Sequence, residues 1–127
     1  MKRWNVIVCS ILAVLLLTAC GSKVDESTAS LYISKAEEVV HFINNGEFDK
    51  IVEQFDERMK ENVTAAQLAE ITPVIEESGS YERIKKQSVQ EKDGNKIVVI
   101  VGEHTEEDRV YTVTFNANDQ IAGLYVQ

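Results

Sequence analysis

The hydrophobic periodicity of this chain changes once, at Gly79, and that change limits the possible folds more than any other feature. Before Gly79, apolar residues recur three and four positions apart, which is the spacing of one face of an α-helix. After Gly79, they alternate every second position and are rich in valine and isoleucine, as in β-strands. A run of helices followed by a run of strands predicts an α+β fold, because the helices and the sheet must bury their apolar faces against one another.

The first half of the chain predicts three helices. Residues 28–46 form the first, which is ended by a glycine of the kind found after many helices. A second apolar stripe covers residues 48–55 and predicts a short helix, which continues as a loose turn through residue 63. The third helix spans residues 64–79 and begins with a capping box. Because Pro73 lacks the backbone donor, we expect a kink in this helix near Ile71 and Thr72.

The second half predicts four strands joined by short turns. Their expected spans are residues 81–91, 97–101, 109–115 and 121–126. Short connections between consecutive strands make the sheet antiparallel. We therefore expect a single domain over residues 28–127, with three N-terminal helices packed on a curved, cone-shaped sheet of four antiparallel strands.

The N-terminus has the pattern of a secretion signal. Two basic residues precede an apolar run over residues 6–17, which is shorter than the roughly 20 residues that a membrane-spanning helix needs. The run leads into Leu-Thr-Ala-Cys-Gly at residues 17–21, which resembles the lipobox of bacterial lipoproteins. We expect residues 1–19 to be a signal peptide that is cut just before Cys20.

The lipobox resemblance implies that Cys20 carries the acyl chains of a membrane anchor. The protein is then held on the extracytoplasmic face of the cell membrane, with residues 20–27 forming the lipidated cysteine and a flexible tether. An ordinary signal peptide that happens to contain Cys20 is the alternative. Because Cys9 leaves with the signal, the mature chain keeps no thiol for a disulfide or a thiolate metal site.

The chain is acidic, with 21 acidic residues against 13 basic ones and a formal net charge of −8. This charge repels phosphate backbones and anionic headgroups, so we expect no nucleic-acid partner. Contact with the membrane is expected through the lipid alone. The sequence has no glycine-rich phosphate loop, and we expect no cofactor.

The two histidines are candidates for chemistry or metal binding. His41 falls about 140° away from the apolar stripe of the first helix, so we expect it at the surface. His104 lies within the acidic stretch 103–108, where neither a calcium loop nor a helical pair of ligands is formed. We interpret His104 as part of an exposed hairpin tip and expect no metal site.

The inward-facing strand positions give the candidate lining of a pocket. They are Tyr111, Val113, Phe115, Tyr125 and Ile84. Only the tyrosines among them are polar, and no aspartate or glutamate falls clearly on an apolar face. Because the acid and base of an enzyme are not visible, we assign no catalytic residue and interpret Tyr111 as an aromatic of the core or pocket wall.

Several short motifs resemble a family of uncharacterised domains on surface lipoproteins of Gram-positive bacteria. These are Asn44-Asn45-Gly46-Glu47-Phe48-Asp49, Phe55-Asp56 with Met59-Lys60, Val63-Thr64 with Gln67-Leu68, Gly79-Ser80-Tyr81, Tyr111-Thr112-Val113-Thr114-Phe115 and Gln120-Ile121-Ala122-Gly123-Leu124. The resemblance covers about residues 30–126, and the family is itself similar to the nuclear-transport-factor-2-like superfamily. It implies a cone with a pocket between the first helix and the sheet, and no established activity. Pro73 departs from the family pattern.

These observations favour a surface-anchored, non-enzymatic module that binds an apolar small molecule, an envelope component or a partner protein. An isomerase- or dehydratase-like enzyme with its active site in the cone is one alternative. Such an enzyme would need a buried polar residue and a carboxyl group of elevated pKa. A structural homodimer formed through the sheet is the other alternative.

Overall fold

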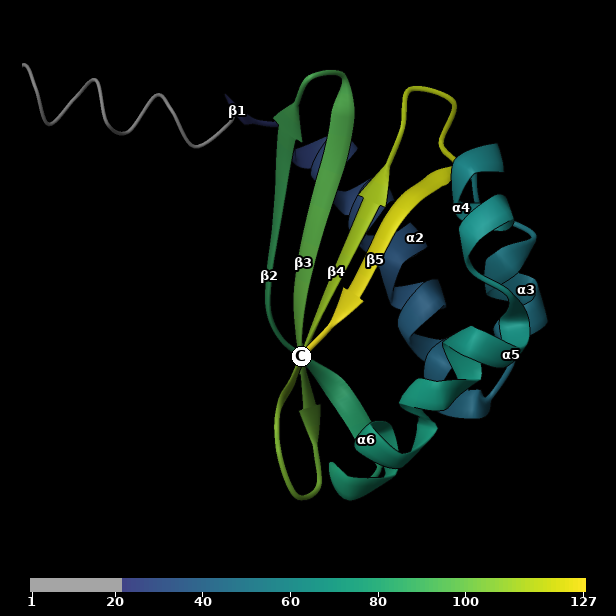
Figure 1. Cartoon of the computed structure of the whole chain (residues 1–127). Coiled ribbons are helices and arrows are strands. Elements are labelled where there is room, and N and C mark those ends of the chain that lie inside the picture. Colours follow the sequence, from purple (N-terminus) through teal and green to yellow (C-terminus); the bar gives the residue numbers. More distant parts are fainter. Residues whose placement is uncertain (1–21) are drawn as a thin grey trace, which may run out of the picture.

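The computed structural model describes residues 22–127, which fold as helices packed on one side of an antiparallel sheet (Figure 1). The α+β class expected from the change of periodicity is therefore confirmed. The predictions for the signal peptide and for Cys20 lie outside the described residues. Within residues 22–127, none of the helices combines the length and apolar character that crossing a bilayer requires.

Helix α2 (Glu26–Asn45) is the main helix of the domain and crosses behind the sheet in Figure 1. It begins at Asp25, whose carboxylate accepts a hydrogen bond from the Thr28 N–H at 3.3 Å. It ends at Gly46, whose φ of 73° is left-handed. Its buried residues follow the predicted stripe: Tyr32, Ala36, Val39, Val40 and Ile43.

The second predicted helix is two short helices, α3 (Phe48–Val52) and α4 (Glu57–Asn62). The loose turn predicted after residue 55 is wrong, because Asp56 starts a new helix by accepting from the Met59 N–H at 2.8 Å. The link between the two helices is bonded to the sheet. The Asp56 N–H donates to the carbonyl of Ile121 at 2.9 Å, and the Ile121 N–H donates to that of Gln54 at 2.8 Å.

The third predicted helix is interrupted as expected. Its first part, α5 (Ala65–Leu68), starts with the predicted capping box of Thr64 and Gln67. A 3-10 turn, η2 (Ala69–Ile71), then leads into α6 (Thr72–Glu77). Pro73 lies in the first turn of α6, where its missing N–H costs nothing because that donor would have no partner within the helix.

The sheet has five strands in the order β1-β2-β3-β4-β5, and adjacent strands are antiparallel. The strands are β1 (Ser22–Lys23), β2 (Tyr81–Lys92), β3 (Asn95–His104), β4 (Arg109–Phe115) and β5 (Ile121–Val126). The prediction of four strands is corrected by β1, which lies in the expected tether and pairs Ser22 with Glu91 at the edge of β2. Such a short polar strand has no alternation that a sequence pattern could reveal.

The inner face of the sheet packs against the helices and forms the core. Val98, Ile100, Tyr111 and Val113 are each 0% exposed. The pairing of β2 with β3 shifts register twice, between Tyr81 and Arg83 and between Ile84 and Lys86. Shifts of this kind bend a strand, and they lie at the start of β2, where the site described next is found.

Candidate functional site

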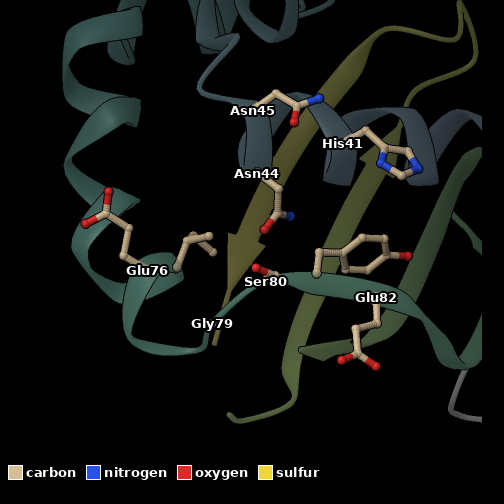
Figure 2. A pocket seen from close by; sticks show the side chains of 9 residues that line it. His41, Asn44, Asn45, Glu76, Gly79, Ser80 and Glu82 are labelled. Atoms are coloured by element: carbon tan, nitrogen blue, oxygen red, sulfur yellow. The ribbon is translucent and has the colours of Figure 1, made fainter. Parts of the chain in front are cut away.

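A pocket of about 560 Å³ lies where three elements meet, namely the end of α2, the end of α6 and the start of β2. Figure 2 shows it from close by. Its lining residues are His41, Asn44, Asn45, Ile75, Glu76, Gly79, Ser80, Tyr81 and Glu82. Most of these are polar or charged, and none is a lysine or arginine. The pocket therefore offers hydrogen-bonding groups without a positive charge.

The link between α6 and β2 is held by the hairpin that joins β3 to β4. Gly79 has a φ of +81°, and a Cβ at this position would lie 1.9 Å from Thr105 Oγ1. That hydroxyl accepts from the Ser80 N–H at 3.1 Å, and the Thr105 N–H donates to the Ser80 carbonyl at 3.0 Å. Only glycine fits here, so the close approach of the two segments depends on it.

His104 lies behind this link and is buried, with only 4% of its surface exposed. The prediction that it belongs to an exposed hairpin tip is wrong. His104 is the last residue of β3 and continues the inward alternation of Val98, Ile100 and Gly102. The exposed tip is confined to residues 105–108.

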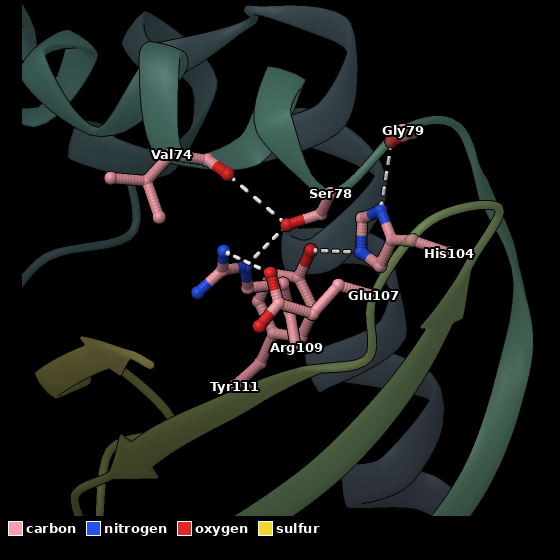
Figure 3. Close-up of polar contacts among 7 residues, drawn as sticks. All are labelled: Val74, Ser78, Gly79, His104, Glu107, Arg109 and Tyr111. Atoms are coloured by element: carbon pink, nitrogen blue, oxygen red, sulfur yellow. Dashed lines mark hydrogen bonds and ion pairs between the residues drawn. The ribbon is translucent and has the colours of Figure 1, made fainter.

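The hydrogen bonds of His104 define which of its ring nitrogens carries the proton (Figure 3). Nδ1 lies 3.0 Å from the Gly79 carbonyl, which can only accept, so Nδ1 is the donor. Nε2 lies 2.8 Å from the Tyr111 hydroxyl, and in a neutral imidazole it accepts the proton of that hydroxyl. Burial raises the pKa of Tyr111, which keeps its hydroxyl protonated as this bond requires.

Asn44 connects the buried pair to the pocket. Its Nδ2 group donates to the Tyr111 hydroxyl at 3.2 Å and to the carbonyl of Val40 at 2.8 Å. A chain of hydrogen bonds thus runs from Gly79 through His104 and Tyr111 to a residue of the pocket wall. Every donor in this chain has an acceptor.

A second polar cluster fastens the end of α6 to β4 (Figure 3). Arg109 donates through Nε to the hydroxyl of Ser78, which is fully buried and itself donates to the carbonyl of Val74 at 3.1 Å. Arg109 also pairs with Glu107 at 3.2 Å. This cluster fixes the segment that leads into Gly79.

Tyr81 forms an aromatic wall of the pocket. Its ring meets His41 edge to face with centroids 5.4 Å apart, and on the other side meets His104 at 5.5 Å. Gly102 makes room for it, since a Cβ there would lie 3.0 Å from both Tyr81 and Tyr111. The Tyr81 hydroxyl is buried without a hydrogen-bond partner among the described residues. Burial, together with the negative charge of Glu37, raises the pKa of Tyr81 to about 12.

None of the five residues predicted to line a pocket lines this one. Tyr111, Val113 and Phe115 are in the core with at most 1% exposure, and Ile84 is half-buried. Tyr125 is 61% exposed, because its pairing with Thr112 places it on the outer face of the sheet. Of the five, Tyr111 alone is connected to the pocket, through Asn44.

The sequence patterns missed the residues that do form the wall. His41 is exposed at the surface as expected, yet it also lines the pocket. The pattern around Asn44 indicates only the end of a helix, and that around Tyr81 only the start of a strand. The period-two alternation could have placed His104 on the inner face, had it been extended beyond Val101.

The acidic stretch around His104 is occupied by ion pairs. Glu103 pairs with Arg83 and Asp108 pairs with Lys85, both at 2.8 Å. Within the part of the chain that the structure describes, no three histidine, cysteine, aspartate or glutamate side chains gather in a way that could hold a metal ion.

The sequence of this domain matches a known family. The model of a family described as "Protein of unknown function (DUF3887)" matches residues 36–124, which begins in the middle of α2 and reaches into β5. No curated protein is significantly similar to the chain. The match includes the whole pocket wall and the buried His104 and Tyr111. The chain thus belongs to the DUF3887 family, whose function is unknown.

Proposed function

We propose that this protein is a lipid-anchored, extracytoplasmic binding module that acts without catalysis and takes a small polar molecule in the pocket between α2 and β2. The observation that carries the proposal is the pocket itself, whose volume of about 560 Å³ lies within the usual range of ligand sites. Its wall of amide, hydroxyl and imidazole groups favours a polar ligand over the apolar one expected from the sequence.

The anchor is the second part of the proposal. The lipobox at Leu17-Thr18-Ala19-Cys20 supports lipid attachment at Cys20 after removal of residues 1–19. One residue separates Cys20 from β1, and the Asp25 cap of α2 follows shortly after. A tether of this length would hold the domain directly at the membrane surface.

We also propose a relationship to the nuclear-transport-factor-2-like superfamily. Its support is the arrangement of helices over one face of a bent antiparallel sheet, with a pocket beside the longest helix. This relationship concerns the fold and does not imply an activity.

A binding role is favoured over an isomerase or dehydratase by the state of the buried polar groups. Among the described residues, no aspartate or glutamate is buried. His104 and Tyr111 could form an acid and base pair, but both are buried and each is bonded to the other. A ligand in the pocket would reach Asn44 instead.

The binding proposal is tested by NMR on the full chain in detergent micelles. We expect small polar probes such as methyl α-glucoside to shift backbone signals around Ser80 and Tyr81. Ser80→Trp should abolish these shifts by filling the pocket, whereas Glu61→Trp on exposed α4 should leave them unchanged. If polar, anionic and apolar probes all leave the pocket signals unshifted, the proposal fails.

A second candidate is self-association through the outer face of the sheet. Tyr125 is 61% exposed on this face, beside half-buried aliphatic residues of neighbouring strands. These are Ile97, Val99, Val101 and Val110. Because these side chains carry no charge, two acidic copies could meet here without placing carboxylates in contact.

Sedimentation at high micromolar concentration tests self-association. We expect dimers of the wild-type chain and monomers of Tyr125→Glu. Leu31→Glu is the matched control, because Leu31 is a similarly exposed apolar residue, at 53%, on α2. A wild-type monomer would eliminate this candidate.

A further inference from the structure

The amide of Asn44 has a fixed orientation that leaves one atom free. Both hydrogens of Nδ2 are used, one by the Val40 carbonyl at 2.8 Å and the other by the Tyr111 hydroxyl at 3.2 Å. Because a backbone carbonyl can only accept, Nδ2 and not Oδ1 must face Val40. No described residue donates to Oδ1, and Figure 2 shows the amide pointing from α2 across the pocket toward Ser80.

The orientation is enforced from behind by buried groups. The Tyr111 hydroxyl gives its proton to His104 Nε2, so its oxygen is available to accept from Asn44. His104 is in turn fixed by its Nδ1 bond to the Gly79 carbonyl. If the amide of Asn44 rotated by half a turn, Oδ1 would face an acceptor and both hydrogen bonds would be lost.

From this geometry, and resting on the proposed binding function, we infer that the pocket selects an uncharged molecule that donates a hydrogen bond from an O–H or N–H group to Asn44 Oδ1. His104 and Tyr111 act as positioning residues for this acceptor. They do not touch the ligand, since Tyr111 is fully buried and His104 nearly so.

The charges around the pocket support an uncharged ligand. The lining carries Glu76 and Glu82 and neither lysine nor arginine, which disfavours an anion. Both carboxylates point away from the centre of the pocket in Figure 2, so they are not placed to pair with a cation inside it. The ring of Tyr81 adds an apolar surface beside the acceptor, which suits a hydroxylated ring or a small amide.

The experiment compares probes whose O–H or N–H donors are present with derivatives in which methyl groups replace the donated hydrogens, using NMR on the full chain in detergent micelles. Methyl α-glucoside is paired with its fully O-methylated derivative, and acetamide is paired with N,N-dimethylacetamide. We expect the donor-bearing member of at least one pair to shift the signals of the Asn44 side chain. It should bind about tenfold more tightly than its methylated partner, which is the difference in affinity that one hydrogen bond makes. The first pair reports on hydroxyl ligands and the second on amide ligands.

Variants separate the role of Asn44 from general effects on the pocket. Asn44→Leu should weaken the donor-bearing probe by about tenfold, whereas Asn45→Leu, its neighbour in the lining, should not. If Asn44→Leu does not fold, Tyr111→Phe provides the test. Tyr111→Phe retains the ring and leaves one Nδ2 hydrogen of Asn44 without an acceptor. The two side-chain N–H signals of Asn44 should therefore shift, and the affinity for the probe should fall.

The outcomes distinguish this inference from the proposed function. Equal binding of donor and methylated probes, or binding of phosphate alone in the pocket, would overturn the inference and leave a binding module for polar molecules. Binding of toluene alone would overturn the inference and also the polar character of the proposed ligand. Unchanged affinity in Asn44→Leu would overturn it as well. If no probe of any class shifts the pocket signals, both the inference and the proposed function fail.

Discussion

Tyr111 shows how one hydroxyl can serve two buried partners at once. It donates to His104 and accepts from Asn44, so its removal would leave a nitrogen of His104 without a donor inside the core. A buried polar atom that loses its partner destabilises a protein by about 1–3 kcal/mol. The position is therefore sensitive to a change of a single atom.

We accordingly expect Tyr111→Phe to lower the free energy of unfolding by about 1–3 kcal/mol in urea denaturation. Tyr125→Phe is the control, because it removes the same atom from a side chain that is 61% exposed. That variant should change stability by less than about 0.5 kcal/mol. Similar effects of the two substitutions would show that the buried hydrogen bond does not stabilise the fold.

Tyr81 should make the domain sensitive to alkaline pH. Its pKa is raised from 10.0 to about 12 in the folded state, so folding favours the protonated phenol. The associated stability is fully present below pH 10 and is lost as the pH rises toward 12. Unfolding measured across this range should show a smaller decline in Tyr81→Phe than in the wild type, and an unchanged decline would contradict the assignment.

For Tyr111, the sequence indicates burial better than it indicates hydrogen-bond partners. The alternation around Tyr111 predicted an aromatic in the core or pocket wall, and the structure places it in the core. Its bonds to Asn44 and His104 join residues far apart in the chain, and no local pattern reports such contacts. The acidic neighbours of His104 suggested solvent, although Glu103 alternates with it on β3 and the others lie beyond the strand in the exposed tip.

Among the elements, the junction between α6 and β2 depends most on a single residue. Gly79 and Gly94 both have a φ of +81°, but a Cβ would meet Thr105 Oγ1 at 1.9 Å only at Gly79, while at Gly94 nothing lies within 4 Å. We expect Gly94→Ala to cost roughly 1–2 kcal/mol of stability through backbone strain. Gly79→Ala should cost about 1–3 kcal/mol more through overpacking.

Thermal and urea unfolding of the two glycine variants provide the measurement. Because the backbone strain is common to both, their difference isolates the steric contact with Thr105. Equal destabilisation would mean that the hairpin moves away without cost. In that case the link that carries Ser80 and Tyr81 would be less rigid than the hydrogen bonds to Thr105 imply.

Element boundaries followed the sequence where a local signal existed. The cap at Thr64, the break before α6 and the bounds of β4 and β5 were all predicted. The division of the second helix into α3 and α4 was not predicted from the sequence. It depends on Asp56 and on backbone bonds to Ile121, a residue of the last strand. Pairing over such a distance in sequence overrides local propensity.

For the whole molecule, the anchor is tested at its own residue. Cys20→Ser should abolish incorporation of labelled palmitate and prevent cleavage of the signal, because position 20 then has no thiol to receive the lipid. Cys9→Ser is the control, since it removes the other cysteine and should leave labelling and membrane retention intact. Continued labelling of Cys20→Ser in membrane fractions would refute lipid attachment at this position.

The short strand β1 also determines which way the domain would face. It pairs with the end of β2, whereas the pocket lies at the beginning of β2 and at the last turns of α2. The 20 residues of α2 span about 30 Å, so a lipid on Cys20 would leave the pocket mouth roughly that far above the bilayer. The site would then sample solutes arriving from the surroundings of the cell rather than lipids from the membrane beneath it.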